Sequence, residues 1–263
     1  MNYKIVSWNV AGLRAMLKKD NFHEFMQTPE NDYTIICLQE TKCESHQATL
    51  PQYIIDKYPY RYWKHCDGKS QRKGLNGVTI WSKIMPLDVF DIHFDNEGRF
   101  LVMDFEKFKL INVYTPNSQQ FENERYYFRQ AWNNTIIDYI STIQNGKPII
   151  FCGDFNVCNE SIDVVDMKSK INKYPGCFDI EREQFKELLK KCNLIDTFRY
   201  LNPELQKFTY WSNFLKQPRS NQNGWRIDYF LCSAEIIKNI KISDTRMDVK
   251  GSDHCPIYIE CVF

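Results

Sequence analysis

The sequence predicts an α/β fold in which mixed β-sheets pack face to face and helices lie outside them. Two observations support this prediction. Apolar runs of strand length are interleaved with amphipathic segments of helix length along the whole chain. Several strand-like runs nevertheless follow one another with only turns between them, as residues 88–94 and 99–105 do. This succession excludes a simple doubly wound parallel sheet, in which helices separate consecutive strands.

The first half of the chain is predicted to consist mainly of strands. Residues 4–8 form a buried strand, and residues 14–26 form a helix that Pro29 stops. A basic, glycine-containing loop over residues 69–77 precedes another strand. Strands are predicted over residues 33–38, 60–66, 78–81, 88–94, 99–105 and 110–114.

The second half begins with the clearest helix, over residues 122–145. Its apolar residues recur at helical spacing from Phe128 to Ile143, and Gly146 follows as a stop signal. Residues 160–175 show no periodicity and are interpreted as an ordered surface loop. The remaining predictions are a helix over residues 181–191, a helical segment over 233–237, and strands over 194–196, 227–231, 240–243 and 256–262.

Composition limits the class of protein. No repeat, linker or shift in composition divides the 263 residues, so we expect one domain over residues 1–263 and a monomer. The formal net charge is +1, so a polyanionic partner must bind to a local basic surface. Without a signal peptide or a run of membrane-spanning length, we expect an intracellular protein that is neither secreted nor membrane-bound. The ten cysteines include no Cys-x-x-Cys pair, so we interpret them as reduced and buried.

Polar groups stand at the ends of several predicted strands. The apolar run at 149–152 leads into Gly153, which permits a tight turn, and Asp154 and Asn156 then project from the strand end. Three other apolar runs are bordered in the same way, by Asn9, by Glu40 and by Asp253-His254. We expect these ends to converge on one acidic, metal-binding, phosphate-cleaving site. Taken singly, each such residue is more often a cap or a turn former.

Taken together, these motifs make the chain similar to the exonuclease III family of apurinic/apyrimidinic-site (AP) endonucleases. The resemblance covers essentially the whole catalytic domain, and six motifs in the family's order make it specific. They are Ser7-Trp8-Asn9, Leu38-Gln39-Glu40-Thr41-Lys42, Tyr114-Thr115-Pro116-Asn117, Gly153-Asp154-Phe155-Asn156, Gly224-Trp225-Arg226-Ile227-Asp228 and Gly251-Ser252-Asp253-His254.

The resemblance implies a four-layer α/β sandwich of two mixed sheets flanked by helices, the deoxyribonuclease-I-like or endonuclease/exonuclease/phosphatase fold. It places the active site at one rim of the sandwich. The implied activity is Mg²⁺-dependent hydrolysis of the phosphodiester 5′ to abasic sites in duplex DNA during base-excision repair. A 3′-exonuclease or 3′-phosphodiesterase activity is an additional expectation.

Hydrolysis of a phosphodiester needs an activated water, neutralised phosphoryl charge and a stabilised leaving group. Glu40 is a hard oxygen ligand suited to Mg²⁺ or Mn²⁺. We expect Asp154 to orient or deprotonate the water, and His254, supported by Asp228, is the second candidate for this role. The other predicted site residues supply metal ligands or phosphate contacts, and they are Asn9, Asp253, Asn156, Tyr114 and Asn117.

The resemblance also implies an aromatic pocket for an extruded abasic nucleotide, formed here by Tyr210, Phe214 and Trp225. Contacts to the DNA backbone are predicted for basic and amide side chains, namely Lys73, Asn76, Arg99, Lys216, Arg219 and Asn223. As single residues, these aromatic and basic groups are more often packing residues or solvated loop residues.

Two positions depart from the family pattern. Ala11 stands where some relatives have an aspartate near the metal, which leaves open whether one or two metals bind. Gln120 stands where some relatives insert an arginine into the duplex. Two other function classes compete with the nuclease: a phosphoinositide phosphatase or sphingomyelinase on the same fold, and a DNA-binding scaffold without catalysis. The motif around Trp225 and Asp228 argues against the first, and the intact acidic residues argue against the second.

Overall fold

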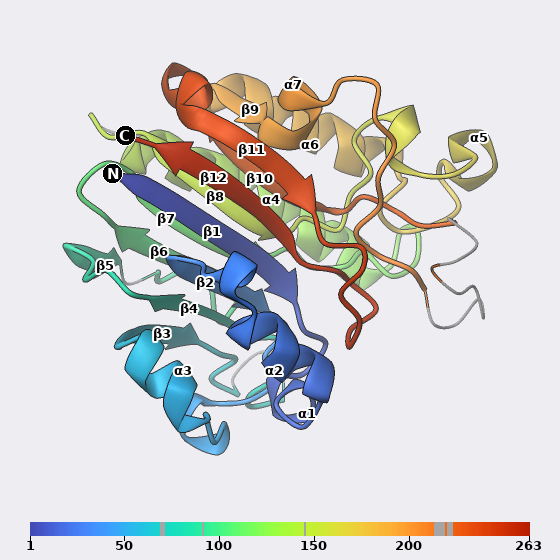
Figure 1. Cartoon of the computed structure of the whole chain (residues 1–263). Coiled ribbons are helices and arrows are strands. Elements are labelled where there is room, and N and C mark those ends of the chain that lie inside the picture. Colours follow the sequence, from blue (N-terminus) through green and yellow to red (C-terminus); the bar gives the residue numbers. More distant parts are fainter. Residues whose placement is uncertain (69–71, 91, 145, 213–218, 220–222) are drawn as a thin grey trace.

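Two mixed β-sheets pack face to face between layers of helices (Figure 1). The computed structural model describes residues 1–68, 72–90, 92–144, 146–212, 219 and 223–263. Within these residues each sheet has six strands, and each contains one parallel pair, β1 with β2 and β7 with β8. The first sheet has the order β11 (Ile240–Thr245), β12 (Ile257–Val262), β1 (Asn2–Asn9), β2 (Ile35–Gln39), β4 (Val78–Ser82), β3 (Tyr60–Lys64). The second has the order β5 (Asp88–Phe90), β6 (Phe100–Asp104), β7 (Lys109–Tyr114), β8 (Ile149–Asp154), β10 (Asp228–Ser233), β9 (Leu194–Asp196).

Helices cover the outer faces of both sheets. The first sheet packs against α1 (Leu13–Met16), α2 (Asp20–Gln27) and α3 (Gln52–Lys57). The second sheet packs against α4 (Glu124–Ile143) and α6 (Asp179–Lys191). The other helical segments are α5 (Met167–Lys170), α7 (Thr197–Leu201) and the 3-10 turns η1 (Pro29–Asn31), η2 (Ser45–Gln47), η3 (Ser161–Asp163) and η6 (Ala234–Asn239).

The main core lies between the sheets, where alternate residues of both sheets point inward. A polar bridge crosses this core next to the rim of the sandwich. The side-chain amide of Gln39 on β2 donates to Asn112 Oδ1 on β7 at 2.7 Å, and Asn112 Nδ2 donates to the carbonyl of Leu38 at 3.1 Å. Both side chains are fully buried, so these bonds fix the first sheet against the second where Glu40 follows β2.

The predicted layers and most elements are confirmed, but some helices differ from the prediction. The helix expected over residues 14–26 is two helices, because Lys19 adopts an extended conformation before α2. The loop expected over residues 160–175 contains η3 and α5. Neither α3 nor α7 was predicted. Helices of one or two turns are too short to establish a 3.6-residue period in the sequence.

The ten cysteines are free and buried, as predicted. Within the described residues, no helix has both the length and the apolar character needed to cross a membrane.

Candidate active site

The polar strand ends meet at one rim of the sandwich. On the second sheet, Asp154 at the end of β8 lies between two register partners, Tyr114 on β7 and Asp228 on β10. On the first sheet, β1 ends at Asn9 and Glu40 follows β2 directly. Asn9 Nδ2 donates to Glu40 Oε1 at 3.0 Å and to Asp154 Oδ2 at 2.9 Å, so its amide joins the two sheets across the site.

Gly153 determines how Asp154 reaches this rim. Its φ is 139°, and a Cβ atom there would lie 2.0 Å from the carbonyl oxygen of Val113 on β7. Only glycine therefore allows β8 to approach β7 this closely immediately before Asp154.

Asp154, His254 and Asp228 form a buried chain of ionisable groups. His254 Nδ1 lies 2.8 Å from Asp228 Oδ2, and His254 Nε2 lies 3.8 Å from Asp154 Oδ2. Burial raises the pKa of Asp154 to about 7, although His254 opposes the shift. Burial alone would lower the pKa of His254, but the charges of Asp228 and Asp154 outweigh it and raise the pKa to about 10. Near neutral pH the imidazole is therefore protonated and Asp154 is close to its titration midpoint.

Glu40 faces Asp154 across the site in an unusual backbone conformation. Its φ is 50°, in the left-handed region that non-glycine residues seldom adopt outside constrained sites. Burial alone would raise the pKa of Glu40, but Lys42, whose Nζ lies 2.8 Å from Oε2, and the amide of Asn9 lower it below its ordinary value. The Tyr114 side chain also hydrogen-bonds Glu40, and burial together with Glu40 raises the pKa of this phenol well above its ordinary value. Glu40 is therefore an ionised carboxylate and Tyr114 a neutral donor.

The donor set of the site suits a hard divalent cation. Carboxylates of Glu40, Asp154 and Asp253 line the same pocket, and oxygen ligands of this kind are those that Mg²⁺ prefers. Asp154, Asp228 and His254 also bring one ligand atom each to within 4.8 Å of one another. One oxygen of the buried Asp228 carboxylate has no hydrogen-bond partner among the described residues. These residues fit a divalent cation, and both Mg²⁺ as that cation and Glu40 as its principal ligand stay predictions.

The two predicted amide ligands are placed differently. Asn9 directs its NH₂ group at both carboxylates, and its Oδ1 accepts a hydrogen bond from the backbone N–H of Ala11 at 3.0 Å. Asn156 Oδ1 accepts from Asn117 Nδ2 at 3.1 Å, and Asn156 Nδ2 donates to the carbonyl of Thr115 at 2.9 Å. This geometry favours an orienting role for Asn9 and Asn156 over direct ligation of the metal.

Aromatic side chains complete a pocket of about 360 Å³ around these groups, which we call the acidic pocket. Tyr210 and Trp225 lie in its wall as predicted, and the backbone of Tyr210 pairs with those of both Trp225 and His254. The predicted Phe214 and Lys216 lie outside the described residues. The remaining wall residues gave no signal in the sequence, and they include Tyr174, Pro175, Gly176, Ser212 and Ile227.

The fold and this pocket agree with comparisons to known proteins. Residues 6–254 match the model of the Endonuclease/Exonuclease/phosphatase family. The chain belongs to this family.

Relatives within the family refine the assignment. An exodeoxyribonuclease of Bacillus subtilis is 37% identical over 259 residues, which cover 97% of each chain. A DNA-(apurinic or apyrimidinic site) endonuclease of Dictyostelium discoideum is 36% identical over 262 residues, covering 97% of this chain and 69% of that protein. The structure of an AP endonuclease from Archaeoglobus fulgidus matches with a TM-score of 0.83 at 25% identity, covering 99% of both chains. The resemblance to AP endonucleases of the exonuclease III family and the four-layer fold are thus confirmed.

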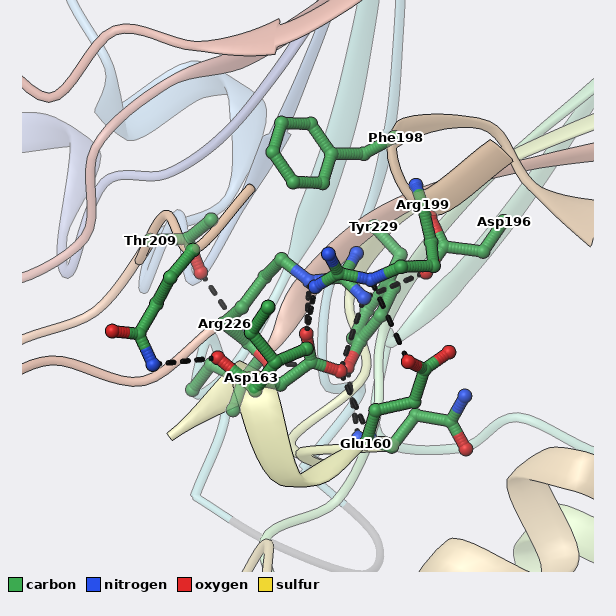
Figure 2. Close-up of polar contacts among 12 residues, drawn as sticks. Glu160, Asp163, Asp196, Phe198, Arg199, Thr209, Arg226 and Tyr229 are labelled. Carbon is green, nitrogen blue, oxygen red and sulfur yellow. Dashed lines mark hydrogen bonds and ion pairs between the residues drawn. The ribbon is translucent and has the colours of Figure 1, made fainter. Parts of the chain in front are cut away.

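In this family member, a buried ionic network supports the Trp225–Asp228 segment (Figure 2). The Arg226 guanidinium bonds both oxygens of Asp163 at 2.7 and 3.0 Å and one oxygen of Asp196 at 2.7 Å. The backbone N–H of Arg226 also donates to the carbonyl of Asp163 at 2.7 Å. The network fixes Arg226 inside the protein and so positions its neighbour Trp225 in the pocket wall and Asp228 beside His254.

Two residues with predicted DNA contacts are buried. Arg99 is 5% exposed, pairs with Glu97 at 2.5 Å and donates to the carbonyl of Tyr114 at 3.1 Å. Asn76, also 5% exposed, accepts from Arg99 Nη2 at 2.8 Å. The polar groups of both residues have partners inside the protein, and a direct DNA contact through either stays a prediction. Arg99 also stacks on the Tyr114 ring, with its guanidinium carbon 4.6 Å from the ring centroid.

Arg219 also turns inward. Its guanidinium stacks on Trp211 and donates to backbone carbonyls of the loop before β12, including Ser252 at 2.8 Å and His254 at 2.7 Å. It supports the loop that carries His254, and a DNA contact through Arg219 stays a prediction.

Of the other predicted contacts, Asn117 lines the acidic pocket. Lys73 is exposed and its Nζ lies 3.3 Å from Glu44. Asn223 is partly buried. A direct DNA contact through Asn117, Lys73 or Asn223 stays a prediction.

A second concavity, of about 790 Å³, lies next to the acidic pocket, and we call it the basic groove. Among the described residues, its lining includes four exposed cationic side chains and no acidic one, and the cations are Arg14, Lys18, Lys42 and Arg72. The groove meets the acidic pocket where Lys42 pairs with Glu40. The sequence predicted no DNA contact for these four cations, because they come from segments that only the fold brings together.

Proposed function

We propose that this protein is a Mg²⁺-dependent endonuclease that hydrolyses the phosphodiester 5′ to abasic sites in duplex DNA during base-excision repair. Trimming of DNA from 3′ ends, as exonuclease or 3′-phosphodiesterase, is a second reaction of the same site. The names of two relatives, an exodeoxyribonuclease and an AP endonuclease, support both activities. In this proposal residues 1–263 act as a single catalytic domain, as a monomer, and inside the cell.

One observation carries the proposal: buried acids, a protonated histidine and aromatic walls share one pocket. The carboxylates of Glu40 and Asp154 and the imidazole of His254 supply what phosphodiester hydrolysis needs, which is a base, a metal site and a cation for the phosphate. The aromatic walls supply a second property that a general phosphatase does not need.

Asp154 is the group that accepts the proton of the attacking water. A base works best when its pKa lies near the operating pH, and burial raises the pKa of Asp154 to about 7. Asp154 is held for this role by the backbone N–H of Asn156, 2.9 Å from Oδ1, and by Asn9 on Oδ2. These bonds fix the direction of its remaining lone pairs toward the pocket.

His254 acts as a cationic donor to a phosphate oxygen. Asp228 accepts from Nδ1, so Nε2 carries its proton on the side that faces Asp154 and the pocket. Asn117 contributes a further donor to the phosphate from the same wall, whereas the single O–H of Tyr114 is directed at Glu40. Glu40, with Asp253 and Asp154, would hold Mg²⁺, which when bound neutralises phosphoryl charge and stabilises the leaving alkoxide.

The aromatic wall selects abasic sites. Tyr174, Tyr210 and Trp225 flank a space next to the acids that suits the apolar face of a deoxyribose without a base. Extrusion of a nucleotide costs least where stacking is already lost, so an abasic residue enters this space more readily than an intact nucleotide.

The test is incision of a duplex with one tetrahydrofuran residue by the purified protein. We expect a single nick 5′ to the lesion with Mg²⁺, none in excess EDTA, and none in a matched duplex without the lesion. Asp154→Asn serves as the inactive control. No nick with Mg²⁺, or faster release of phosphate from a soluble inositol phosphate than incision of the lesion, would overturn the proposal.

A further inference from the structure

We propose that the buried ion pair between Arg129 on α4 and Glu181 on α6 is a positioning device that aligns three segments of the acidic pocket. Neither residue is among the described residues that line the acidic pocket. The inference rests on the proposed function for its rate measurements, and on the geometry alone for a second, structural measurement. Arg129 is 2% exposed and Glu181 is 1% exposed, with 3.2 Å between Nη1 and Oε1.

Arg129 holds the turn that carries Asn156. Its Nη1 donates to the carbonyl of Asn156 and its Nη2 to the carbonyl of Phe155, each at 2.8 Å. Asn156 has a φ of 49°, a left-handed conformation that persists only where surrounding contacts enforce it. The same turn directs the backbone N–H of Asn156 at Asp154 Oδ1. The guanidinium therefore fixes the turn that orients the base.

Glu181 holds two other segments at once. Its Oε2 accepts the backbone N–H of Gly176 at 2.6 Å and that of Phe178 at 3.1 Å, and Gly176 ends the pocket wall that begins at Tyr174. Its Oε1 accepts the hydroxyl of Ser118 at 2.5 Å, directly after Asn117. One carboxylate thus connects the aromatic wall to the segment that lines the phosphate side of the pocket.

The several contacts that each member of this pair makes explain why these residue types are present. A buried ion pair seldom gains stability over apolar side chains of similar size, so stability alone is a weak reason for its presence. A planar guanidinium can donate to two carbonyls in fixed directions while it pairs with a carboxylate, which a lysine ammonium does not reproduce. Likewise, a carboxylate accepts several N–H and O–H donors at once, whereas a glutamine has one acceptor oxygen. The pair is therefore suited to aligning the pocket segments that it contacts.

The experiment compares variants of the pair with a core variant on the same helix. Arg129→Lys removes the planar guanidinium that donates to two carbonyls, and Glu181→Gln removes one of the two acceptor oxygens. The double variant Arg129→Met, Glu181→Leu replaces the pair with apolar side chains, so that a folded protein without the ion pair and its hydrogen bonds can be assayed. Ile140→Val is the control, because Ile140 is fully buried on α4 and packs in the core over the second sheet, away from the pocket. All are assayed well below their melting temperatures.

We expect the three pair variants to lose about 10²-fold in kcat on the tetrahydrofuran duplex with less than about threefold change in KM, because small misplacements of reacting groups cost rate rather than binding. Hydrogen exchange in the segment around Gly176 should accelerate in these variants and stay unchanged in Ile140→Val. Wild-type rates in the double variant, or losses no larger than those of Ile140→Val, would overturn the inference.

The two proposals fail in different ways. If the wild type does not incise the lesion, the proposed function fails, and the exchange measurement still decides the inference. If the wild type incises it and neither kcat nor exchange responds to the pair, the inference alone is wrong.

Discussion

The acidic pocket and the basic groove are neighbours, but the charged side chains of the pocket are mostly buried and those of the groove are exposed. Asp154, Asp228 and His254 are almost fully buried and hydrogen-bonded to one another or to neighbouring groups. The cations of the basic groove, such as Arg14 and Lys18, are exposed to solvent. Buried charges have shifted pKa values and fixed directions, which chemistry requires. Exposed cations can exchange their counterions for phosphates, which affinity for DNA requires.

This difference explains how a chain with a net charge of +1 can act on a polyanion. Positive charge is concentrated in the groove that faces solvent, and the negative charge of the pocket is enclosed and partly neutralised by His254 and Lys42. The comparison implies that rate and affinity are separable by mutation. Substitutions in the pocket should change kcat, and those in the groove should change binding and its salt dependence.

The largest expected effect is that of Asp154→Asn. The amide keeps the shape of the side chain but cannot accept a proton, so kcat should fall by at least about 10³-fold, within the range for loss of a general base. Binding of the tetrahydrofuran duplex, measured by fluorescence anisotropy in EDTA, should change less than threefold. A loss of affinity comparable to the loss of rate would mean that catalysis in the pocket and DNA binding in the groove are not separable.

The next effect concerns pH and Asp228. Burial alone would lower the pKa of His254, but the charges of Asp228 and Asp154 outweigh burial and raise this pKa to about 10. The imidazole therefore stays protonated up to about pH 10. The rate should therefore rise as Asp154 ionises near pH 7 and fall near pH 10. Asp228→Asn removes the principal partner, and an imidazole with an ordinary pKa of about 6.5 would be only about 3% protonated at pH 8, a loss of about 30-fold.

The measurement is the pH profile of kcat for both proteins between pH 6 and 10.5, with melting curves as a control for folding. An alkaline limb that stays near pH 10 in Asp228→Asn would show that His254 does not act as the cationic donor.

A smaller effect is expected from the basic groove. The double charge reversal Arg14→Glu, Lys18→Glu should raise KM about tenfold with kcat unchanged, and should reduce the slope of log KM against log salt by about 1 to 2, since each phosphate contact contributes about 0.9. The double variant Lys238→Glu, Lys241→Glu is the matched control, because it makes the same change in net charge at two exposed positions outside the groove. Equal effects in the groove and control variants would count against DNA binding in the groove.

The two regions also differed in how far the sequence predicted them. Asp154, Glu40 and His254 lie at strand ends, where an apolar run, a turn residue and a polar group stand next to one another in the chain. Such signals are local, and the order of the motifs, which resembles that of the family, indicated that these residues belong to one site. The strands and the longest helix were predicted for the same reason, since each repeats a period over enough residues to be seen.

Burial of long basic side chains was not predictable, because it depends on partners from distant segments. Arg99 was expected at the surface, but Asn76 and Glu97 enclose it, and Arg125 from α4 pairs with the same Glu97 at 2.7 Å. The Arg219 guanidinium likewise donates its hydrogen bonds to carbonyls of the loop before β12. The groove cations were missed for the converse reason, since residues far apart in sequence form one surface only after folding.

The smallest effect is expected at Lys42, where the two regions meet. Its ammonium lies 2.8 Å from Glu40 Oε2 and its side chain is 41% exposed, so in the proposed mechanism Lys42 would compete with the divalent cation for Glu40. An exposed pair of this kind contributes about 0.2 to 1 kcal/mol, so Lys42→Gln should lower the Mg²⁺ concentration for half-maximal rate by about 1.4- to 5-fold. The groove loses one cation, and KM for DNA should rise slightly in the same variant. The titration is run at saturating duplex, which separates the two effects. A higher Mg²⁺ requirement would mean that Lys42 orients Glu40 for the metal rather than competing with it, and that the boundary between pocket and groove is part of the metal site.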